Sequence, residues 1–337
     1  MKVDAGLGAT LATAGAEAVR VEEAGYDGAW TAETSHDPFL PLALAAEHTE
    51  QLELGTGIAV AFARNPMTTA MVGWDLQTHS GGRLMLGLGS QIRPHITRRF
   101  SMPWSRPAAR MREFVLAMRA IWDCWQHDVP LSFDGEFYTH TLMTPFFNPG
   151  PQPHGPPRVF LAAVGERMTE VAGEVCDGML VHGFTTERYL REVTLPALER
   201  GAARAGKDVA TIERSLPAFV VTGADEQATR RAAEGVRSQI AFYGSTPAYR
   251  PVLELHGWGE LQSDLNRLSK EGRGGEMGTL IDDEILETFA VVAEPGRVAA
   301  ALRARYGDLV QRVSFYTPAA SDHGFWQPIV EQLREDG

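Results

Sequence analysis

The chain has 337 residues and a net charge of −12 at pH 7, and 44% of its residues are hydrophobic. This size and composition are typical of a globular α/β protein with a large core, and the acidic balance argues against nucleic acid as a partner. Two cysteines, Cys124 and Cys176, are too few for a disulfide framework or a four-thiolate metal site, so we expect buried thiols in a reducing cytoplasm.

Segments with a strand pattern alternate with amphipathic segments along most of the chain. The opening residues are too short and polar for a signal peptide, and no apolar run is long enough to cross a bilayer, so we expect no membrane partner. The predicted strands are 3–7, 27–31, 53–60, 83–88, 158–162, 178–181, 216–221 and 310–316. The predicted helices are 13–24, 40–49, 66–78, 106–125, 166–175, 186–204, 226–242, 280–289, 295–306 and 323–334.

Two stretches interrupt this alternation. The proline-rich stretch 126–157 contains a small hairpin around Asp134-Gly135, and we interpret it as an insertion packed on the main fold. The stretch 245–278 is dense in glycine, which is typical of a mobile flap. Because strand–helix units imply parallel strands, we predict a single α/β domain over 1–337, a (β/α)8 TIM barrel with the insertion after the fourth helix and the flap before the last helices. A doubly wound open sheet is the alternative.

The third predicted strand carries two glycines, Gly55 and Gly57, and runs into Asn65-Pro66, where proline ends a strand and opens a helix. Glycine inside a strand marks either a bulge or a place where a flat ligand approaches the backbone. A bend needed to close a barrel explains the glycines equally well, so both interpretations stay open.

In a barrel, chemistry belongs at the C-terminal ends of the strands. The predicted ends are 33–38, 60–65, 89–94, 163–167 and 181–185. The ten histidines are scattered and no His-Glu-x-x-His helix occurs, so we expect no metal site. A Gly-x-Ser-x-Gly elbow is also missing, which argues against a serine hydrolase.

Two strand ends have the character of anion sites. A helix is predicted to begin just after Gly165, and the free backbone N–H groups of its first turn favour a phosphate, with close packing of the turn as the alternative. Arginines after the fourth strand indicate either a solvated loop or a basic rim that captures an extended acidic ligand. They are Arg93, Arg98, Arg99 and Arg106.

Four motifs, each present once, follow one another in a definite order along the chain. They are 24–30 leading into His36-Asp37-Pro38-Phe39, Leu54-Gly55-Thr56-Gly57-Ile58 running to Arg64-Asn65-Pro66, Ser80-Gly81-Gly82-Arg83-Leu84 with Leu86-Gly87-Leu88-Gly89, and 172–178. Together they resemble the luciferase-like monooxygenase superfamily, and within it the oxidoreductases that use the deazaflavin F420.

The resemblance implies a cis peptide bond between Gly57 and Ile58, whose bulge supports the cofactor ring from behind. It implies that His36 lies beside the reactive ring carbon as proton donor, proton acceptor or substrate binder, with simple stacking beside the ring as the alternative. It also implies that Ala163, Val164 and Gly165 hold the cofactor phosphate. The full set of implied cofactor contacts is Asp37, Gly57, Ile58, Ala59, Gly89, Ser90, Gln91, Ala163, Val164, Gly165, Glu166, His182 and Gly183, the last two at the ribityl-phosphate arm.

The chain departs from the family after the fourth strand. Relatives that act on glucose 6-phosphate place a glutamate there, whereas this chain has Ser90-Gln91-Ile92-Arg93. This argues against sugar-phosphate chemistry and leaves His36, Gln91 acting through water, or a substrate group as the proton donor.

By resemblance, the activity is hydride transfer between F420 and a small organic substrate with a CH–OH, C=C or C=N group. The alternatives are an FMN-dependent monooxygenase of the same superfamily and a non-catalytic flavin- or deazaflavin-binding protein. The resemblance also implies a homodimer. Candidate pocket walls, for each of which a place in the core is the favoured alternative, are Trp30, Phe39, Phe62, Trp74 and Trp104.

Overall fold

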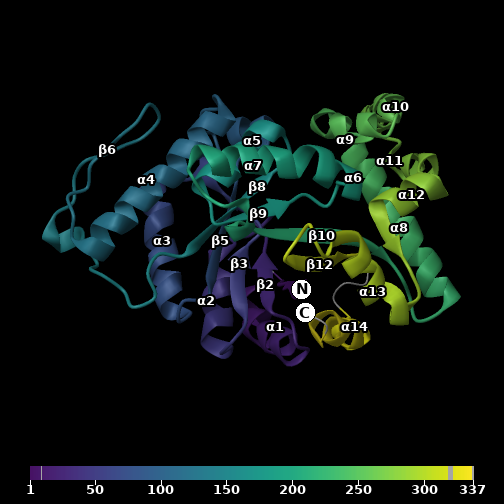
Figure 1. Cartoon of the computed structure of the whole chain (residues 1–337), viewed down its shortest axis with the longest axis horizontal. Helices are drawn as coiled ribbons and strands as arrows, with labels where there is room; N and C mark the ends of the chain where they lie inside the picture. The colour runs from purple at the N-terminus through teal and green to yellow at the C-terminus, as the bar shows by residue number, and fades with distance from the viewer. Residues whose placement is uncertain (9, 318–321, 336–337) are drawn as a thin grey trace.

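Parallel strands close into a barrel in the computed structural model, which describes residues 1–8, 10–317 and 322–335. The strands pair in the ring order β1-β2-β3-β5-β8-β9-β10-β12, and β12 pairs back with β1 (Figure 1). The barrel strands are β1 (Lys2–Gly6), β2 (Gly28–Thr31), β3 (Glu53–Thr56) continued by β4 (Ala59–Val60), β5 (Leu84–Gly89), β8 (Arg158–Ala163), β9 (Gly178–Val181), β10 (Glu213–Val221) and β12 (Arg312–Tyr316). The predicted barrel is confirmed, and the doubly wound alternative is wrong because an open sheet would leave two strand edges unpaired.

Helices surround the strands, as the alternation of strand and helix patterns predicts (Figure 1). They are α1 (Leu11–Glu23), α2 (Phe39–His48), α3 (Pro66–His79), α4 (Pro107–His127), α5 (Glu166–Val175), α6 (Glu187–Tyr189), α7 (Leu195–Arg204), α8 (Glu226–Gly244), α9 (Arg250–Leu255), α10 (Gly259–Lys270), α11 (Gly274–Met277), α12 (Asp283–Phe289), α13 (Pro295–Tyr306) and α14 (His323–Glu335). The start of α3 shows why the sequence folds this way: the Asn65 side chain accepts from the Thr68 N–H, and Pro66 fills the first helical position.

A charged network fills the barrel interior at the end where the strands begin. Arg312 is fully buried and donates to Asp4 (2.8 and 2.5 Å), to Glu53 (2.5 Å) and to Glu213 (3.2 Å). Arg158 donates to Glu213 at 2.6 Å and also bonds Glu53. Burial opposes the charge on Glu53, but Arg312 holds the pKa of its carboxyl at about 2. This end of the barrel is therefore closed by paired charges.

The stretch 245–278 differs from its sequence expectation. It forms α9, α10 and α11 and packs with α8 around a second hydrophobic cluster that includes Leu253, Leu265 and Met277. Two of its glycines stand between these helices: Gly257 and Gly272 follow helix ends in the left-handed conformation that favours glycine. Gly259 and Gly274 are the first residues of α10 and α11. The glycine density thus marks helix boundaries.

The stretch between α4 and β8 packs on α4 and reaches away from the strands (Figure 1). It contains the predicted hairpin, formed by β6 (Phe133–Asp134) and β7 (Thr139–His140). The Glu113 carboxylate of α4 accepts the backbone N–H groups of Glu136, Phe137 and Tyr138, which fixes the hairpin to the helix.

The structure contains a short strand that the sequence pattern did not predict, and it places both cysteines as the sequence predicted. β11 (Ala290–Val292) pairs with the second half of β10, and the sequence pattern missed it because only the short stretch 290–294 separates two helical segments. Cys124 and Cys176 are buried free thiols, as expected. Within the described ranges, no helix is both long enough and apolar enough to span a membrane.

Candidate functional site

The sequence-predicted site residues lie along one rim of the barrel. They follow the C-terminal ends of β2, β3–β4, β5, β8 and β9, which are consecutive neighbours in the ring. Parallel strands end at the same edge of a sheet, so this rim brings together positions that are up to about 150 residues apart in sequence.

The junction between β3 and β4 is the central feature of the rim. The Gly57–Ile58 peptide bond is cis, which confirms the expectation from the family resemblance. The Gly57 N–H donates to the Thr31 carbonyl (2.6 Å), and the Glu33 N–H donates to the Ile58 carbonyl (3.1 Å). The β2–α2 turn therefore holds this backbone from one side.

Glu33 also clamps the same backbone through its side chain. One carboxylate oxygen, Oε2, accepts the buried Val60 N–H at 2.7 Å and the Arg64 Nη1–H at 2.5 Å. Only 7% of the Glu33 side chain is exposed, whereas 41% of the Asp37 side chain, which also binds Arg64, is exposed. The sequence prediction missed Glu33, although it opens the predicted 33–38 turn and Arg64 lies in the strand-three motif.

The backbone at Gly57 is bare toward the barrel mouth. Gly57 is exposed, and the nearest atoms that a Cβ added there would meet are Trp30 carbons at 3.6 Å, an ordinary van der Waals contact. Gly6, at the end of β1, is also exposed, and a Cβ there would meet nothing within 4 Å. The Ile58 side chain occupies the space beside Gly89, where a Cβ would overlap Ile58 Cδ1. The absence of side chains at Gly57 and Gly6 leaves room for a flat ring to lie against the backbone.

His36 and Asp37 have different surroundings on the β2–α2 turn. His36 is exposed, and its ring makes no hydrogen bond or ion pair with any residue that the structure describes. Both Asp37 oxygens are engaged: Oδ1 accepts the Phe39 and Leu40 N–H groups, and Oδ2 accepts from Arg64 at 3.0 Å. Asp37 therefore caps the start of α2, which the sequence prediction did not anticipate.

The residues after β8 form the start of α5. Ala163 is buried, Val164 is half-buried, and Gly165 is the exposed residue that precedes the helix. Among the residues that the structure describes, no side chain caps this end of α5, so its first N–H groups have no side-chain partner there. The Glu166 carboxylate pairs with Arg200 of α7 at 2.6 Å, so only its backbone N–H is available to an anion.

The residues after β5 form hydrogen bonds with their immediate sequence neighbours. Ser90 donates to the Gln91 carbonyl at 3.1 Å, and the Gln91 side chain accepts the Ile92 N–H at 2.9 Å. Gln91 has a positive φ of 58°. Ala59, from the neighbouring β4, is fully buried where it pairs with β5.

The basic rim divides into bound and unbound arginines. Arg99 donates to the Thr34 carbonyl of the β2–α2 turn, and Arg106 pairs with Glu136 of the hairpin. Arg93 and Arg98 are exposed and make no ion pair or hydrogen bond from their side chains to the described part of the chain. The segment therefore presents two uncommitted guanidinium groups beside the turn that carries His36.

His182 and Gly183 follow β9 and lie in an aromatic cluster. His182 Nδ1 accepts the Phe184 N–H at 3.0 Å, and its Nε2 lies 3.1 Å from Tyr249 Oη. Burial lowers the pKa of His182 to about 4. A Cβ on Gly183 would lie 2.8 Å from the Pro217 carbonyl and 3.2 Å from the Tyr316 ring, so glycine permits this close approach.

The candidate wall aromatics separate into two groups. Phe39, Phe62 and Trp74 are buried in the main core between barrel and helices, as the alternative interpretation has it. Trp30 points into the barrel, where its Nε1–H donates to Asp4, and Trp104 is half-buried against Phe62.

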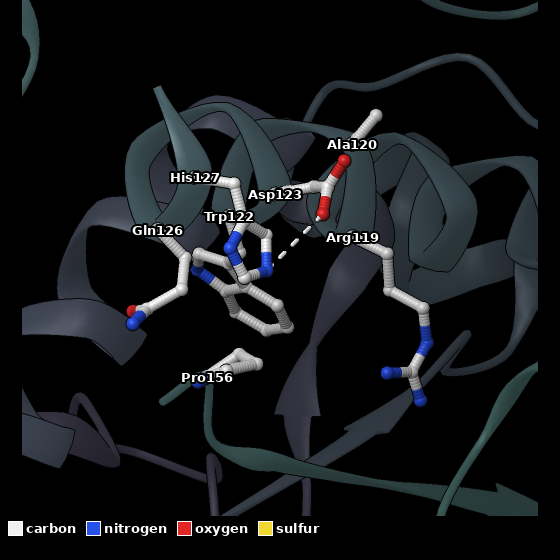
Figure 2. Close-up of a pocket in the computed structure, with 7 residues that line it drawn as sticks. All are labelled: Arg119, Ala120, Trp122, Asp123, Gln126, His127 and Pro156. Carbon is white, nitrogen blue, oxygen red and sulfur yellow. Dashed lines mark ion pairs between the residues drawn. The ribbon is translucent and has the colours of Figure 1, made fainter. Parts of the chain in front are cut away.

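A surface cavity of about 360 Å³ lies on α4 (Figure 2). It is lined by Arg119, Ala120, Trp122, Asp123, Gln126, His127 and Pro156. Arg119 binds Asp177, which directly precedes β9, so the cavity lies near the end of the barrel where the strands begin. It is not part of the rim.

The chain is similar to proteins of one family along most of its length. A family model described as luciferase-like monooxygenase matches residues 2–312. An uncharacterized protein of Mycobacterium tuberculosis is 60% identical over 321 residues, covering 95% of this chain and 94% of that protein. The 5,10-methylenetetrahydromethanopterin reductase of Archaeoglobus fulgidus is 27% identical, covering 82% of this chain and 81% of that protein. The solved structure of coenzyme F420 dependent tetrahydromethanopterin reductase from Methanopyrus kandleri matches with a TM-score of 0.78 and 20% identity, covering 99% of this chain and 97% of that one.

Proposed function

The chain belongs to the luciferase-like monooxygenase family, and from that premise we propose that it is an F420-dependent oxidoreductase acting on a small organic substrate. The observation that carries the proposal is the bare, clamped backbone at Gly57 and Ile58, at the mouth of a barrel like that of an F420-dependent reductase. The relative from Archaeoglobus fulgidus, also named as a reductase, supports an oxidoreductase from sequence.

The residues of the rim fit a deazaflavin. Gly57 and Ile58 would support the ring from behind, since no side chain of Gly57 stands in its way. The uncapped first turn of α5, at Gly165 and Glu166, would accept a phosphate through backbone N–H groups. His182 and Gly183 would lie beside the connecting arm. When bound, the cofactor supplies the hydride chemistry, and the barrel supplies position.

His36 is the group of this chain that we assign to substrate binding or proton transfer. Its ring is exposed and unbonded to described residues, so both ring nitrogens can face a substrate. We propose that it holds or moves a proton at one of these nitrogens while the clamped backbone keeps the cofactor in place.

The second candidate function is an FMN-dependent monooxygenase, which the description of the matching family favours. The basic rim favours F420, because Arg93 and Arg98 have no described partner and suit an extended acidic tail. The substrate class that we propose has a CH–OH, C=C or C=N group.

The same reasoning extends to assembly and compartment. We propose a homodimer, because the stretch between α4 and β8 exposes large apolar side chains, Leu142, Phe146 and Phe147, with Phe146 89% exposed. We propose the cytoplasm because both cysteines are free thiols. Light scattering that gives a monomer at working concentration would remove the dimer.

The proposed function is tested by titrating the cofactor-free chain with F420 and, separately, with FMN while following the fluorescence of each ring. We expect F420 to bind and FMN to bind weakly. Gly57→Val should weaken F420 binding, because its side chain would project toward the ring, whereas Gly274→Val, at another open position, should not. Tight binding of FMN with none of F420 would reverse the choice.

Turnover is tested in both directions with one screen. F420 reduction is measured with alcohols, and oxidation of reduced F420 is measured with enones and imines. His36→Ala should lose turnover and keep F420 binding, and unchanged turnover would remove the assigned role of His36.

A further inference from the structure

Three tyrosines and His182 form a wall across the barrel mouth from the clamped backbone. The ring order sets β10 opposite β3, and the wall stands on the two strands that flank β10. His182 follows β9 and Tyr316 ends β12, while Tyr243 ends α8 and Tyr249 precedes α9. A flat ring supported by Gly57 and Ile58 would therefore turn its free face toward this wall.

The hydrogen bonds of His182 decide how Tyr249 is oriented. Because Nδ1 accepts the Phe184 N–H, the neutral ring carries its proton on Nε2. That Nε2–H donates to Tyr249 Oη at 3.1 Å, and the two rings stack with centroids 4.6 Å apart. Burial keeps His182 neutral at pH 7, since its pKa is lowered to about 4. The Tyr249 oxygen is thus an acceptor, and no described residue accepts the Tyr249 proton.

A pair of tyrosine hydroxyls lies beside the His182–Tyr249 pair. Tyr243 Oη and Tyr316 Oη are 2.7 Å apart, so one of the two protons is used between them and the other is left over. The Tyr243 ring meets His182 edge-on at 4.6 Å, and the Tyr316 ring stacks on Phe219 at 4.9 Å. Burial raises the pKa of Tyr249 to about 12 and raises that of Tyr316, so both hydroxyls keep their protons at neutral pH.

The wall offers hydrogen-bond donors and aromatic surface without charge. Phe184 packs against Tyr243 and Tyr249, and none of the wall residues takes part in an ion pair among the residues described. A carboxylate or phosphate placed here would meet no cation from the wall itself, whereas an uncharged oxygen would find a ready donor.

Resting on the proposed function, we propose that this wall is the substrate subsite and that it selects an uncharged substrate whose carbonyl or hydroxyl oxygen accepts a hydrogen bond from Tyr249. His182 acts as a positioning residue, because it fixes the Tyr249 oxygen and leaves the Tyr249 proton pointing elsewhere. Tyr243 and Tyr316 provide the aromatic side of the subsite.

The test uses 4-fluoroacetophenone as an uncharged ketone probe and 4-fluorobenzoate as its charged counterpart, each followed by its ¹⁹F signal on the full chain. We expect the ketone to bind more tightly than the carboxylate. Tyr249→Phe should weaken ketone binding about fivefold, the usual net effect of one hydrogen bond. Tyr26→Phe, at the opposite end of the barrel, is the matched control and should leave binding unchanged.

Each outcome decides the proposal. Equal ketone affinity in wild type and Tyr249→Phe, or benzoate binding as tight as ketone binding, would overturn it. Absence of ketone binding up to about 10 mM, with and without F420, would also overturn it. Tyr249→Phe should keep wild-type F420 affinity and an unchanged circular dichroism spectrum. A chain that binds the ketone through Tyr249 but binds no F420 would remove the proposed function and leave the subsite standing.

Discussion

Replacing Glu33 by glutamine tests whether the backbone at Gly57 and Ile58 is held by the β2–α2 turn. Glutamine keeps the shape of the side chain and an oxygen acceptor but removes its charge. In the wild-type chain that one oxygen accepts from both the buried Val60 N–H and Arg64. The substitution therefore weakens two charge-assisted hydrogen bonds at a side chain that is only 7% exposed.

The expected cost follows from these two bonds. A hydrogen bond to a charged group contributes about 1 kcal/mol more than a neutral one, so Glu33→Gln should lower the free energy of unfolding by about 2 kcal/mol. Asp37→Asn is the matched control: it removes a charge from the same Arg64, keeps the acceptor that caps α2, and lies at a 41% exposed side chain. An exposed ion pair contributes at most about 1 kcal/mol, so the control should cost less than that.

The two variants are compared by urea unfolding followed through tryptophan fluorescence, and by F420 titration. We expect Glu33→Gln to weaken F420 binding about tenfold, because a displaced backbone at Gly57 and Ile58 no longer supports the ring. Asp37→Asn should bind F420 like the wild type. Equal unfolding free energies for the two variants, within about 0.5 kcal/mol, would refute the clamp.

Three further predictions concern the barrel and its mouth. Asp4→Asn should lower the free energy of unfolding by about 3 kcal/mol in urea, because it leaves the fully buried Arg312 without its bidentate partner; a loss below about 1 kcal/mol would contradict this. Gly87→Ala should destabilise the chain by about 2 kcal/mol in the same assay, since its Cβ would overlap the Thr56 carbonyl and backbone must move; wild-type stability would count against the packing described. The unfolded chain binds a proton at His182 near pH 6.5, whereas the folded chain does so near pH 4, so stability should fall by up to about 3 kcal/mol as pH drops through that window. His182→Gln should show a shallower decline, and an unchanged slope would contradict the lowered pKa.

The barrel was predictable because its signals are local. Each strand is a short apolar run, each helix has a periodic face, and Pro66 marks a helix start that the structure reproduces. The helices of the stretch 245–278 were not predicted, because glycine density has two meanings. Gly257 and Gly272 end helices in the left-handed conformation, a local role that a count of glycines does not distinguish from flexibility.

The candidate site was predictable only in part, because its decisive contacts are long-range. The rim residues and the cis peptide bond followed from the family motifs. The Glu33–Arg64 pair spans 31 residues and the His182–Tyr249 pair spans 67, and no periodicity links such positions. Tyr249 lies in the stretch that was expected to be a flap, so its part in the mouth depended on three helices that the pattern did not reveal.

The electrostatics of the barrel are compatible with the proposed anionic cofactor and the proposed uncharged substrate, although the chain is acidic. At the closed end, Lys2, Arg158 and Arg312 balance Asp4, Glu53 and Glu213, so this network adds no net charge beneath the mouth. The wall opposite β3 carries hydroxyls and a neutral histidine. The groups that attract anions therefore lie at the edge of the mouth, at the first turn of α5 and at the uncommitted arginines after β5. That separation favours anionic groups of a cofactor at the edge and an uncharged reacting group inside, although the chain as a whole carries −12.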